Sequence, residues 1–214
     1  SMHLIHRGIV NKHYKENLSV SFKQSFKKGY GIETDIHATK DKEFVCFHDF
    51  TLKRTFKKNL SIKNLSYSKI KKISTKLKKP IPLLKDLLKS SKNRFSLFIE
   101  IKPNFSKFLL KKLLKETSKF KKCVFISFKH KNIYNLLKIK SNTKVGLSFA
   151  PPISVRTIIK QSNNKDINCL ILDKSYLKNK NIYNLKIEKY YYTIKSKSEF
   201  NKFKKSNNLI FENL

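Results

Sequence analysis

The sequence predicts an α/β fold, a compact (β/α)8 TIM barrel, in which eight parallel strands close inside a ring of helices. Two observations carry this prediction. Short, nearly continuous apolar runs, typical of buried parallel strands, alternate with segments whose apolar residues recur every three or four positions. The 214 residues are enough for one domain and fewer than the roughly 250 of a typical barrel. We therefore expect one barrel domain over residues 1–214.

Nine segments have the length and composition of strands. In chain order they are 3–6, 31–36, 44–48, 95–102, 123–128, 144–149, 168–172, 190–194 and 209–211. The nine reduce to eight barrel strands if 44–48 is a short return strand after the second. An open doubly wound sheet fits the same pattern, because periodicity does not reveal whether a sheet closes.

Helices are predicted between the strands, where apolar residues follow the i, i+3, i+4 spacing of one helix face. The clearest examples are Leu83, Leu84, Leu87 and Leu88; Phe105, Phe108, Leu109 and Leu113; Ile133, Leu136 and Leu137; and Val155, Ile158 and Ile159. The last strand segment is followed only by residues 212–214. We therefore expect the eighth helix to be missing.

Residues 51–80 form a lysine-rich excursion from this alternation. Its least periodic part, 59–79, still carries Leu65, Ile70, Ile73 and Leu77 at roughly helical spacing. We expect an ordered insertion within the barrel domain and not a domain boundary.

The composition indicates a globular protein with a strongly basic surface. Lys and Arg number 49 against 14 Asp and Glu, for a net charge of +35, and the 39% hydrophobic content with 17 Phe is too high for a disordered chain. All but four of the basic residues are lysines spread along the chain. Scattered lysine is typical of a solvated surface that attracts anions, whereas specific nucleic-acid recognition favours clustered arginine. A nucleic-acid-binding protein is therefore the less favoured class, although Tyr and Phe are available for base stacking.

Cysteine spacing and hydropathy bear on the compartment. Cys46, Cys123 and Cys169 lie far apart without a C-x-x-C pair, which argues against a disulfide framework and a zinc knuckle. No run approaches the roughly 18 apolar residues of a membrane span, and the first residues do not resemble an export signal. The sequence predicts a cytoplasmic protein.

Four charged groups stand at the ends of predicted strands. Glu33 and Asp35 are two positions apart, which places both side chains on one face of a strand. Glu100 and Lys102 repeat this spacing at the end of an otherwise apolar strand. The other two groups are His6-Arg7 and His48-Asp49. Because the carboxyl ends of barrel strands meet in one site, these side chains are expected to converge.

Three of these residues are candidate metal ligands. The carboxylates of Glu33, Asp35 and Glu100 would repel one another in one pocket unless a cation neutralised them. Hard oxygen ligands favour Mg²⁺, Ca²⁺ or Mn²⁺ over zinc.

The remaining groups suit transfer of a phosphoryl group. His6 and His48 are candidate general acid and base, because an unperturbed imidazole titrates near neutral pH. Arg7 and Lys102 supply positive charge for an anionic group. Ser127 and the cysteines show no nucleophile arrangement with His and Asp. The histidines without such neighbours, which we assign to surface or core, are His3, His13, His37 and His130.

In order along the chain, the four motifs resemble the H-R-G, E-x-D, H-D-x-x-L-x-R-T and E-x-K motifs of the glycerophosphodiester phosphodiesterase family. They read here His6-Arg7-Gly8, Glu33-Thr34-Asp35, His48-Asp49-Phe50-Thr51-Leu52-Lys53-Arg54-Thr55 and Glu100-Ile101-Lys102. The resemblance continues at Ile81-Pro82-Leu83-Leu84, Ser127-Phe128 and Tyr192-Thr193-Ile194, so that it covers nearly the whole chain. The chain departs from the family at three places. The family's P-E-N-T is here Lys15-Glu16-Asn17-Leu18, which keeps Glu16 and Asn17 only. The family's seventh-strand Trp is Tyr192, and its T-D or T-N near the eighth strand is Glu212-Asn213.

The resemblance implies a (β/α)8 barrel of the phospholipase C-like phosphodiesterase type. It also implies a hydrolase of lipid and glycerol metabolism that releases an alcohol and sn-glycerol 3-phosphate from glycerophosphodiesters. It implies one divalent cation, Mg²⁺ or Ca²⁺, held by Glu33, Asp35 and Glu100. His6 and His48 would then be acid and base, and Arg7 and Lys102 the phosphate contacts.

Several alternatives stay open within this reading. Either water or the neighbouring glycerol hydroxyl could attack phosphorus, the second through a cyclic phosphate. A related phosphodiesterase acting on lysophospholipid or sphingolipid head groups is the second candidate.

The basic surface would suit weak electrostatic contact with anionic membranes, and we expect no specific nucleic acid partner. The oligomeric state is open.

Overall fold

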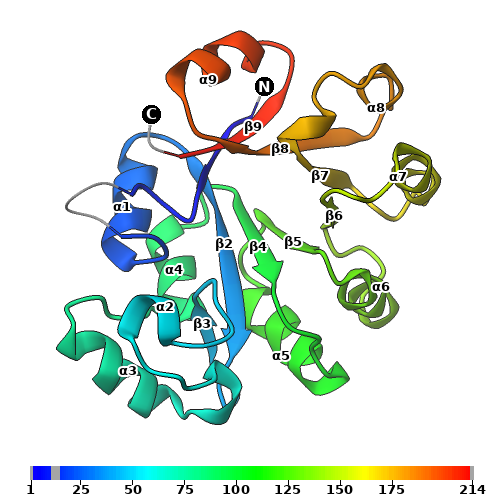
Figure 1. Ribbon diagram of the computed structural model, residues 1–214. Coiled ribbons are helices and arrows are strands. Elements are labelled where there is room, and N and C mark those ends of the chain that lie inside the picture. The colour runs from blue at the N-terminus through cyan, green and yellow to red at the C-terminus, as the bar shows by residue number, and fades with distance from the viewer. Residues whose placement is uncertain (1, 11–14, 213–214) are drawn as a thin grey trace.

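A computed structural model describes residues 2–10 and 15–212 of the chain. Eight parallel strands close into a barrel, because β1 pairs with β9 on one side and with β2 on the other (Figure 1). This closure confirms the predicted barrel over the open sheet. The strands are β1 (Leu4–His6), β2 (Gly31–Ala38), β4 (Leu97–Ile101), β5 (Cys123–Ser127), β6 (Val145–Phe149), β7 (Cys169–Asp173), β8 (Glu188–Ile194) and β9 (Asn208–Phe211).

The ninth predicted strand is the expected return strand. β3 (Phe44–Cys46) runs antiparallel to the carboxyl-terminal part of β2, pairing Ala38 with Phe44 and Ile36 with Cys46. It is two residues shorter than predicted, although the Phe47 backbone N–H still donates to the Asp35 carbonyl oxygen at 3.0 Å. The chain then turns away, which places His48 beside the carboxyl end of β2.

Helices surround the barrel (Figure 1). They are α1 (Ser19–Lys27), α4 (Leu84–Ser91), α5 (Lys107–Thr117), α6 (His130–Ile139), α7 (Val155–Ser162), α8 (Lys180–Tyr183) after a short 3₁₀ turn η2 (Lys174–Tyr176), and α9 (Lys197–Phe203). Of these, α4, α5, α6 and α7 lie where the apolar periodicity predicts helices. Serine N-caps begin several of them; the Ser106 hydroxyl, for example, accepts from the Leu109 N–H at 3.2 Å. Of the described residues, only Glu212 follows β9. No helix within the described ranges has the length and apolar content needed to cross a bilayer.

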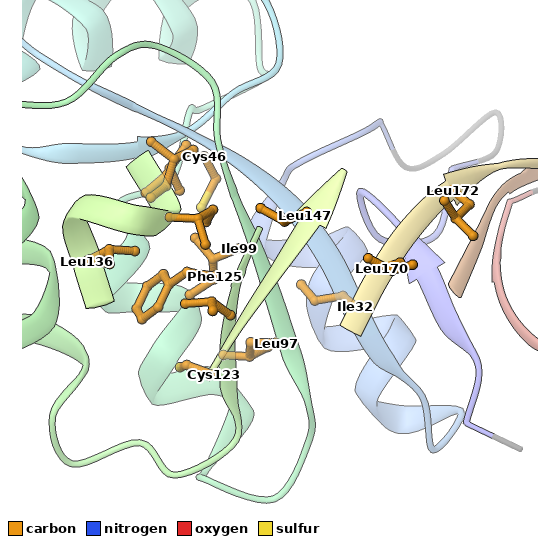
Figure 2. Close-up of a cluster of buried hydrophobic side chains, with 14 of the residues drawn as sticks. Ile32, Cys46, Leu97, Ile99, Cys123, Phe125, Leu136, Leu147, Leu170 and Leu172 are labelled. Carbon is orange, nitrogen blue, oxygen red and sulfur yellow. The ribbon is translucent and has the colours of Figure 1, made fainter. Parts of the chain in front are cut away.

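The main hydrophobic core lies between the strands and the helices. Outward-facing side chains of neighbouring strands, such as Ile99 and Phe125, pack against buried residues of the surrounding helices, such as Leu136. Figure 2 shows part of this layer, with Leu136 beside Phe125, Leu97 and Ile99 on β4, and Leu147 on β6. Cys46, Cys123 and Cys169 are all buried free thiols.

The inside of the barrel is divided into an apolar and a charged half. A second cluster of buried residues fills the amino-terminal half: Leu4, Phe98, Ile126, Cys169, Ile171, Tyr190 and Ile210. Gly146 leaves room for this packing, since a Cβ there would lie 2.6 Å from the Cys169 Sγ. Two positions further along the chain, Glu100 follows Phe98 in β4, and Glu212 follows Ile210 just beyond the end of β9. Strand alternation thus aims charged side chains at the carboxyl-terminal half.

The predicted excursion is ordered and has a hydrophobic cluster of its own. It comprises α2 (Lys53–Phe56), the 3₁₀ turn η1 (Ile62–Asn64) and α3 (Tyr67–Lys76), which lie beside β3 in Figure 1. Its cluster consists of Val45, Phe47, Leu52, Phe56, Ile62, Ile70, Ile73 and Ile81. Because Val45 belongs to β3 and Phe47 follows it directly, the cluster joins the excursion to the return strand.

Candidate active site

All seven predicted site residues line one pocket at the carboxyl ends of the strands. The pocket has a volume of about 310 Å³ and contains His6, Arg7, Glu33, Asp35, His48, Glu100 and Lys102. Its other lining residues are Ile126, Phe128, Ile171, Tyr192, Thr193, Lys195, Ile210 and Glu212. The convergence expected from strand ends is therefore present.

Strand register brings the charged side chains together. His6 on β1 is the register partner of Glu33 on β2, and Asp35 is the partner of Glu100 on β4. The three strands are neighbours, so their inward-facing residues form adjacent columns. The i, i+2 spacing read from the sequence thus sets the geometry of the site.

The three carboxylates of Glu33, Asp35 and Glu100 each offer an oxygen, and these oxygens lie within 4.8 Å of one another. All three residues are buried, and Glu33 Oε2 has no hydrogen-bond partner among the described atoms. Burial, followed by repulsion from Asp35 and Glu100, raises the pKa of Glu33 well above its ordinary value. Burial and the Asp35 charge raise the pKa of Glu100 to about 7. An unpartnered oxygen in a crowded, buried carboxylate set fits a divalent cation.

Two basic side chains flank the carboxylates. Arg7 Nε lies 3.2 Å from Asp35 Oδ2, and Lys102 Nζ lies 2.8 Å from Glu100 Oε2. Burial would lower the pKa of Lys102, but Glu100 and Asp35 outweigh it and raise that pKa. Burial would also lower the pKa of Arg7, but the charges of Asp35 and Glu16 outweigh it and raise that pKa. Both side chains therefore stay cationic beside the pocket.

Each candidate catalytic histidine has a carboxylate on its Nδ1 atom. His6 Nδ1 lies 2.8 Å from Glu212 Oε2, and His48 Nδ1 lies 2.7 Å from Asp49 Oδ1. The other nitrogen of His6, Nε2, lies 3.7 Å from Glu33 Oε2. Burial lowers the pKa of His48, although the Asp35 charge opposes the shift. With Nδ1 engaged, Nε2 is the atom of each ring that remains to exchange protons with a bound molecule.

An ion-pair network extends from His48 to Arg7. Arg54 donates from Nε to Asp49 Oδ2 at 2.8 Å and from Nη1 to Glu16 Oε1 at 3.1 Å. The second oxygen of Glu16 accepts from Arg7 Nη1 at 3.0 Å. Burial would raise the pKa of Asp49, but hydrogen bonds from Arg54 and His48 lower it to about 2. This network joins the loop after β1 to the loop after β3.

Sequence reasoning gave no role to three residues that touch the site. Glu212 pairs with His6, and the sequence feature that could have identified it is its position directly after the last strand. Asn17 donates to Asp35 Oδ2 at 3.2 Å and accepts from the Thr34 hydroxyl at 2.8 Å; its signal was the retained Glu16-Asn17 pair. His37, assigned to surface or core, is buried and has Nε2 3.0 Å from the His48 carbonyl oxygen. No sequence pattern marks that contact.

The other histidines lie away from the pocket. His3 Nδ1 accepts from the Leu209 N–H at 3.1 Å, near the amino ends of β1 and β9. His130 Nε2 lies 2.9 Å from the Ser148 carbonyl oxygen. His13 lies outside the described residues.

A parallel eight-stranded barrel with its charged pocket at the carboxyl ends of the strands is the arrangement of TIM-barrel proteins. Within that class, this chain belongs to the glycerophosphoryl diester phosphodiesterase family, whose model matches residues 6–210.

Individual proteins agree with this assignment. A glycerophosphodiester phosphodiesterase of Caldanaerobacter subterraneus subsp. tengcongensis is 29% identical over 161 residues, or 68% of this chain and 65% of that protein. A human protein named lysophospholipase D GDPD1 is 32% identical over 127 residues, or 53% of this chain and 40% of its own length. The matches thus span two thirds or less of these relatives.

Solved structures share the fold over nearly the whole chain. A glycerophosphodiester phosphodiesterase from Thermotoga maritima superposes with a TM-score of 0.83 at 21% identity, covering 99% of this chain and 93% of that one. A phosphodiesterase from Oleispira antarctica, solved in complex with its product sn-glycerol-3-phosphate, gives a TM-score of 0.84 at 17% identity, covering 99% and 92%.

Proposed function

We propose that this protein hydrolyses glycerophosphodiesters to an alcohol and sn-glycerol 3-phosphate with the help of one divalent cation. The observation that carries the proposal is the meeting of Glu33, Asp35 and Glu100 in a pocket that also holds two histidines and two basic side chains. Family membership supports the reaction class. The product complex of the Oleispira antarctica protein supports the product.

Glu33, Asp35 and Glu100 are the residues that would hold the cation. Their hard oxygen donors suit Mg²⁺ or Ca²⁺, and a cation would satisfy the unpartnered oxygen of Glu33. A bound divalent ion supplies positive charge that offsets the negative charge of a phosphodiester during displacement at phosphorus.

The residues of the chain itself account for the other requirements. Arg7 and Lys102 bind phosphate oxygens and orient phosphorus in the pocket. Nε2 of one histidine, His6 or His48, accepts the proton of the attacking hydroxyl as the new O–P bond forms. Nε2 of the other donates a proton to the leaving oxygen as its P–O bond breaks. For attack by water, this exchange completes the reaction. Attack by the neighbouring glycerol hydroxyl yields a cyclic phosphate, which water then opens by the same exchange with the two histidines in reversed roles.

Lysophospholipids or sphingolipid head groups are the second candidate substrate class. The observation that favours lysophospholipids is the similarity to proteins named lysophospholipase D from human, mouse and rat. The pocket chemistry is the same in both cases, since a lysophospholipid is also a phosphodiester of glycerol.

The predicted cytoplasmic location is consistent with the three buried free thiols.

A substrate panel tests this choice. The compounds are glycerophosphocholine, glycerophosphoethanolamine, a lysophospholipid and a bis-aryl phosphodiester, each with Mg²⁺, Ca²⁺ or a chelator. We expect release of glycerol phosphate from both soluble diesters with weak discrimination between head groups. A preference of more than about tenfold in kcat/KM for the lysophospholipid, equivalent to about 1.4 kcal/mol, would favour the second class. Inactivity across the panel would contradict the proposed reaction.

A further inference from the structure

Three large apolar side chains are exposed on loops at the carboxyl-terminal face of the barrel. Phe50 follows β3, Phe128 follows β5 and Ile153 follows β6, and 51%, 42% and 41% of their surfaces are exposed. We call these three residues the apolar rim. Exposed apolar side chains gathered at one face of a protein indicate an interaction surface.

The apolar rim lies next to the candidate active site. Phe128 lines the pocket, with its ring 6.0 Å from that of Tyr192 and 5.9 Å from Lys102 Nζ. Phe50 comes two residues after His48 in sequence, and its ring meets the edge of His37 at 4.9 Å. A molecule bound to the rim would therefore stand at the entrance of the pocket.

The loop that carries Ile153 is fixed to the barrel. The Ile153 carbonyl oxygen accepts from the Tyr176 hydroxyl at 2.6 Å, and the Phe149 carbonyl oxygen accepts from the Tyr192 hydroxyl at 2.9 Å. The two donors belong to the next elements around the barrel, η2 after β7 and strand β8. The exposed side chain of Ile153 is thus held outward by an anchored backbone.

The charges around the apolar rim are basic. In the described loops that follow β3 to β8, the exposed charged residues are lysines: Lys129, Lys178 and Lys195. The acidic residues of the same loops are not exposed; Asp49, for example, is paired with Arg54 and His48. Exposed lysines therefore outnumber exposed carboxylates at this face, since the loop from β2 to β3 adds Lys40 and Lys42 but only one exposed acidic residue, Asp41.

We propose that the apolar rim docks on an anionic phospholipid surface, so that the pocket opens toward the membrane. Lysines near a membrane surface attract anionic lipids, and partly exposed aromatic and aliphatic side chains insert at the headgroup level. A nucleic acid fits less well, because Ile153 offers no stacking surface and the nearby cations are lysines and not arginine forks. On the proposed function, this docking selects glycerophosphodiesters that lie in a membrane, and lysophospholipids are that class.

Vesicle binding tests the docking independently of catalysis. The protein is sedimented with phosphatidylcholine vesicles that contain or lack phosphatidylglycerol, at low and high salt. We expect binding to the anionic vesicles, weakened by salt. The double variant Phe50→Ser with Ile153→Ser should bind them about tenfold more weakly or worse.

A matched control variant is available at the opposite end of the barrel. Tyr183, the last residue of α8, is 53% exposed, close to the value for Phe50, and precedes the amino end of β8. Tyr183→Ser should bind vesicles as the parent does. Equal binding by the rim variant and the parent, with both unfolding at the same temperature, would overturn the proposal. So would equal loss in the rim variant and in Tyr183→Ser, or stronger binding to an RNA oligonucleotide that displaces the vesicles.

Activity measurements separate this proposal from the proposed function. Neither Phe50 nor Ile153 lines the pocket, so the rim variant should hydrolyse soluble glycerophosphocholine like the parent and lose activity only on lysophospholipid in anionic vesicles. Vesicle docking without any phosphodiesterase activity would contradict the function and leave the docking standing. Equal activity of parent and rim variant on the vesicle substrate would overturn the docking as a selector of substrate.

Discussion

Glu212 holds His6 across the point where the barrel closes. Its Oε2 lies 2.8 Å from His6 Nδ1, and its backbone N–H donates to the Ile194 carbonyl oxygen at 2.9 Å. The hydrogen bond from His6 lowers the pKa of Glu212, which keeps this side chain a carboxylate. Asp49 makes the equivalent contact with His48. Both histidines are thereby fixed with Nε2 available to the pocket.

We predict that Glu212→Gln lowers kcat by about 10- to 100-fold while KM changes little. Glutamine preserves a polar contact but not the negative charge that stabilises a protonated His6. The expected loss is smaller than the roughly 10²- to 10⁴-fold contribution of a complete acid or base. Steady-state kinetics of the variant with a soluble glycerophosphodiester check the assignment, because a positioning role should lower kcat and leave KM close to the parent's. A kcat equal to the parent's would contradict this role.

We expect His6→Ala and His48→Ala each to lower kcat by roughly 10²- to 10⁴-fold and to leave the fold intact. Each substitution removes the Nε2 atom that would move a proton. His3→Ala is the control, since His3 lies at the amino ends of the strands and should affect stability alone. Steady-state kinetics with a soluble glycerophosphodiester measure both effects. Near-parental kcat in either site variant would remove that histidine from the mechanism.

The residues of the site that stand at the ends of strands could be predicted from the sequence. Pairs of charged residues two positions apart in apolar strands have to face one way, and parallel strands of a barrel present their carboxyl ends together. Glu33 and Glu100 could therefore be placed in one pocket from the sequence alone. The contact of His37 with the His48 carbonyl could not, because it depends on where the chain turns after β3.

Acid should selectively weaken the stabilising contribution of Asp49. Its pKa is lowered from 3.8 to about 2, so the contribution is complete above pH 4 and is lost as the pH falls through 2. We predict that Asp49→Asn lowers the free energy of unfolding at pH 7 by on the order of 1 kcal/mol, because solvent screens a pair with a largely exposed Arg54. Urea unfolding should show the two proteins converging near pH 2. A difference that persists there would contradict the assignment.

The excursion is expected to unfold together with the barrel. Ile70 is fully buried in the cluster that also contains Val45 of β3 and Phe47, which follows β3. We predict that Ile70→Ala costs about 2 to 5 kcal/mol and shifts one cooperative transition as a whole. Calorimetry together with circular dichroism checks this. A separate low-temperature transition of the excursion would contradict the single domain over residues 1–214.

The fold was predictable where local patterns are strong and less so where long-range pairing decides. The runs at 123–128 and 144–149 became β5 and β6 with small changes at their ends. Closure was not encoded in any local pattern, since it depends on β1 pairing with both β2 and β9. The end of β3 was also missed, because it depends on the packing of the excursion beneath it.

The most direct test of the account is metal-dependent hydrolysis by the parent and by the double variant Glu33→Gln with Glu100→Gln. The protein is stripped with a chelator, titrated calorimetrically with Mg²⁺ and Ca²⁺, and assayed for glycerol phosphate released from glycerophosphocholine. We predict that the parent binds one ion, that the ion restores activity, and that the double variant neither binds nor hydrolyses. Activity that resists the chelator, or ion binding that is unchanged in the double variant, would contradict it.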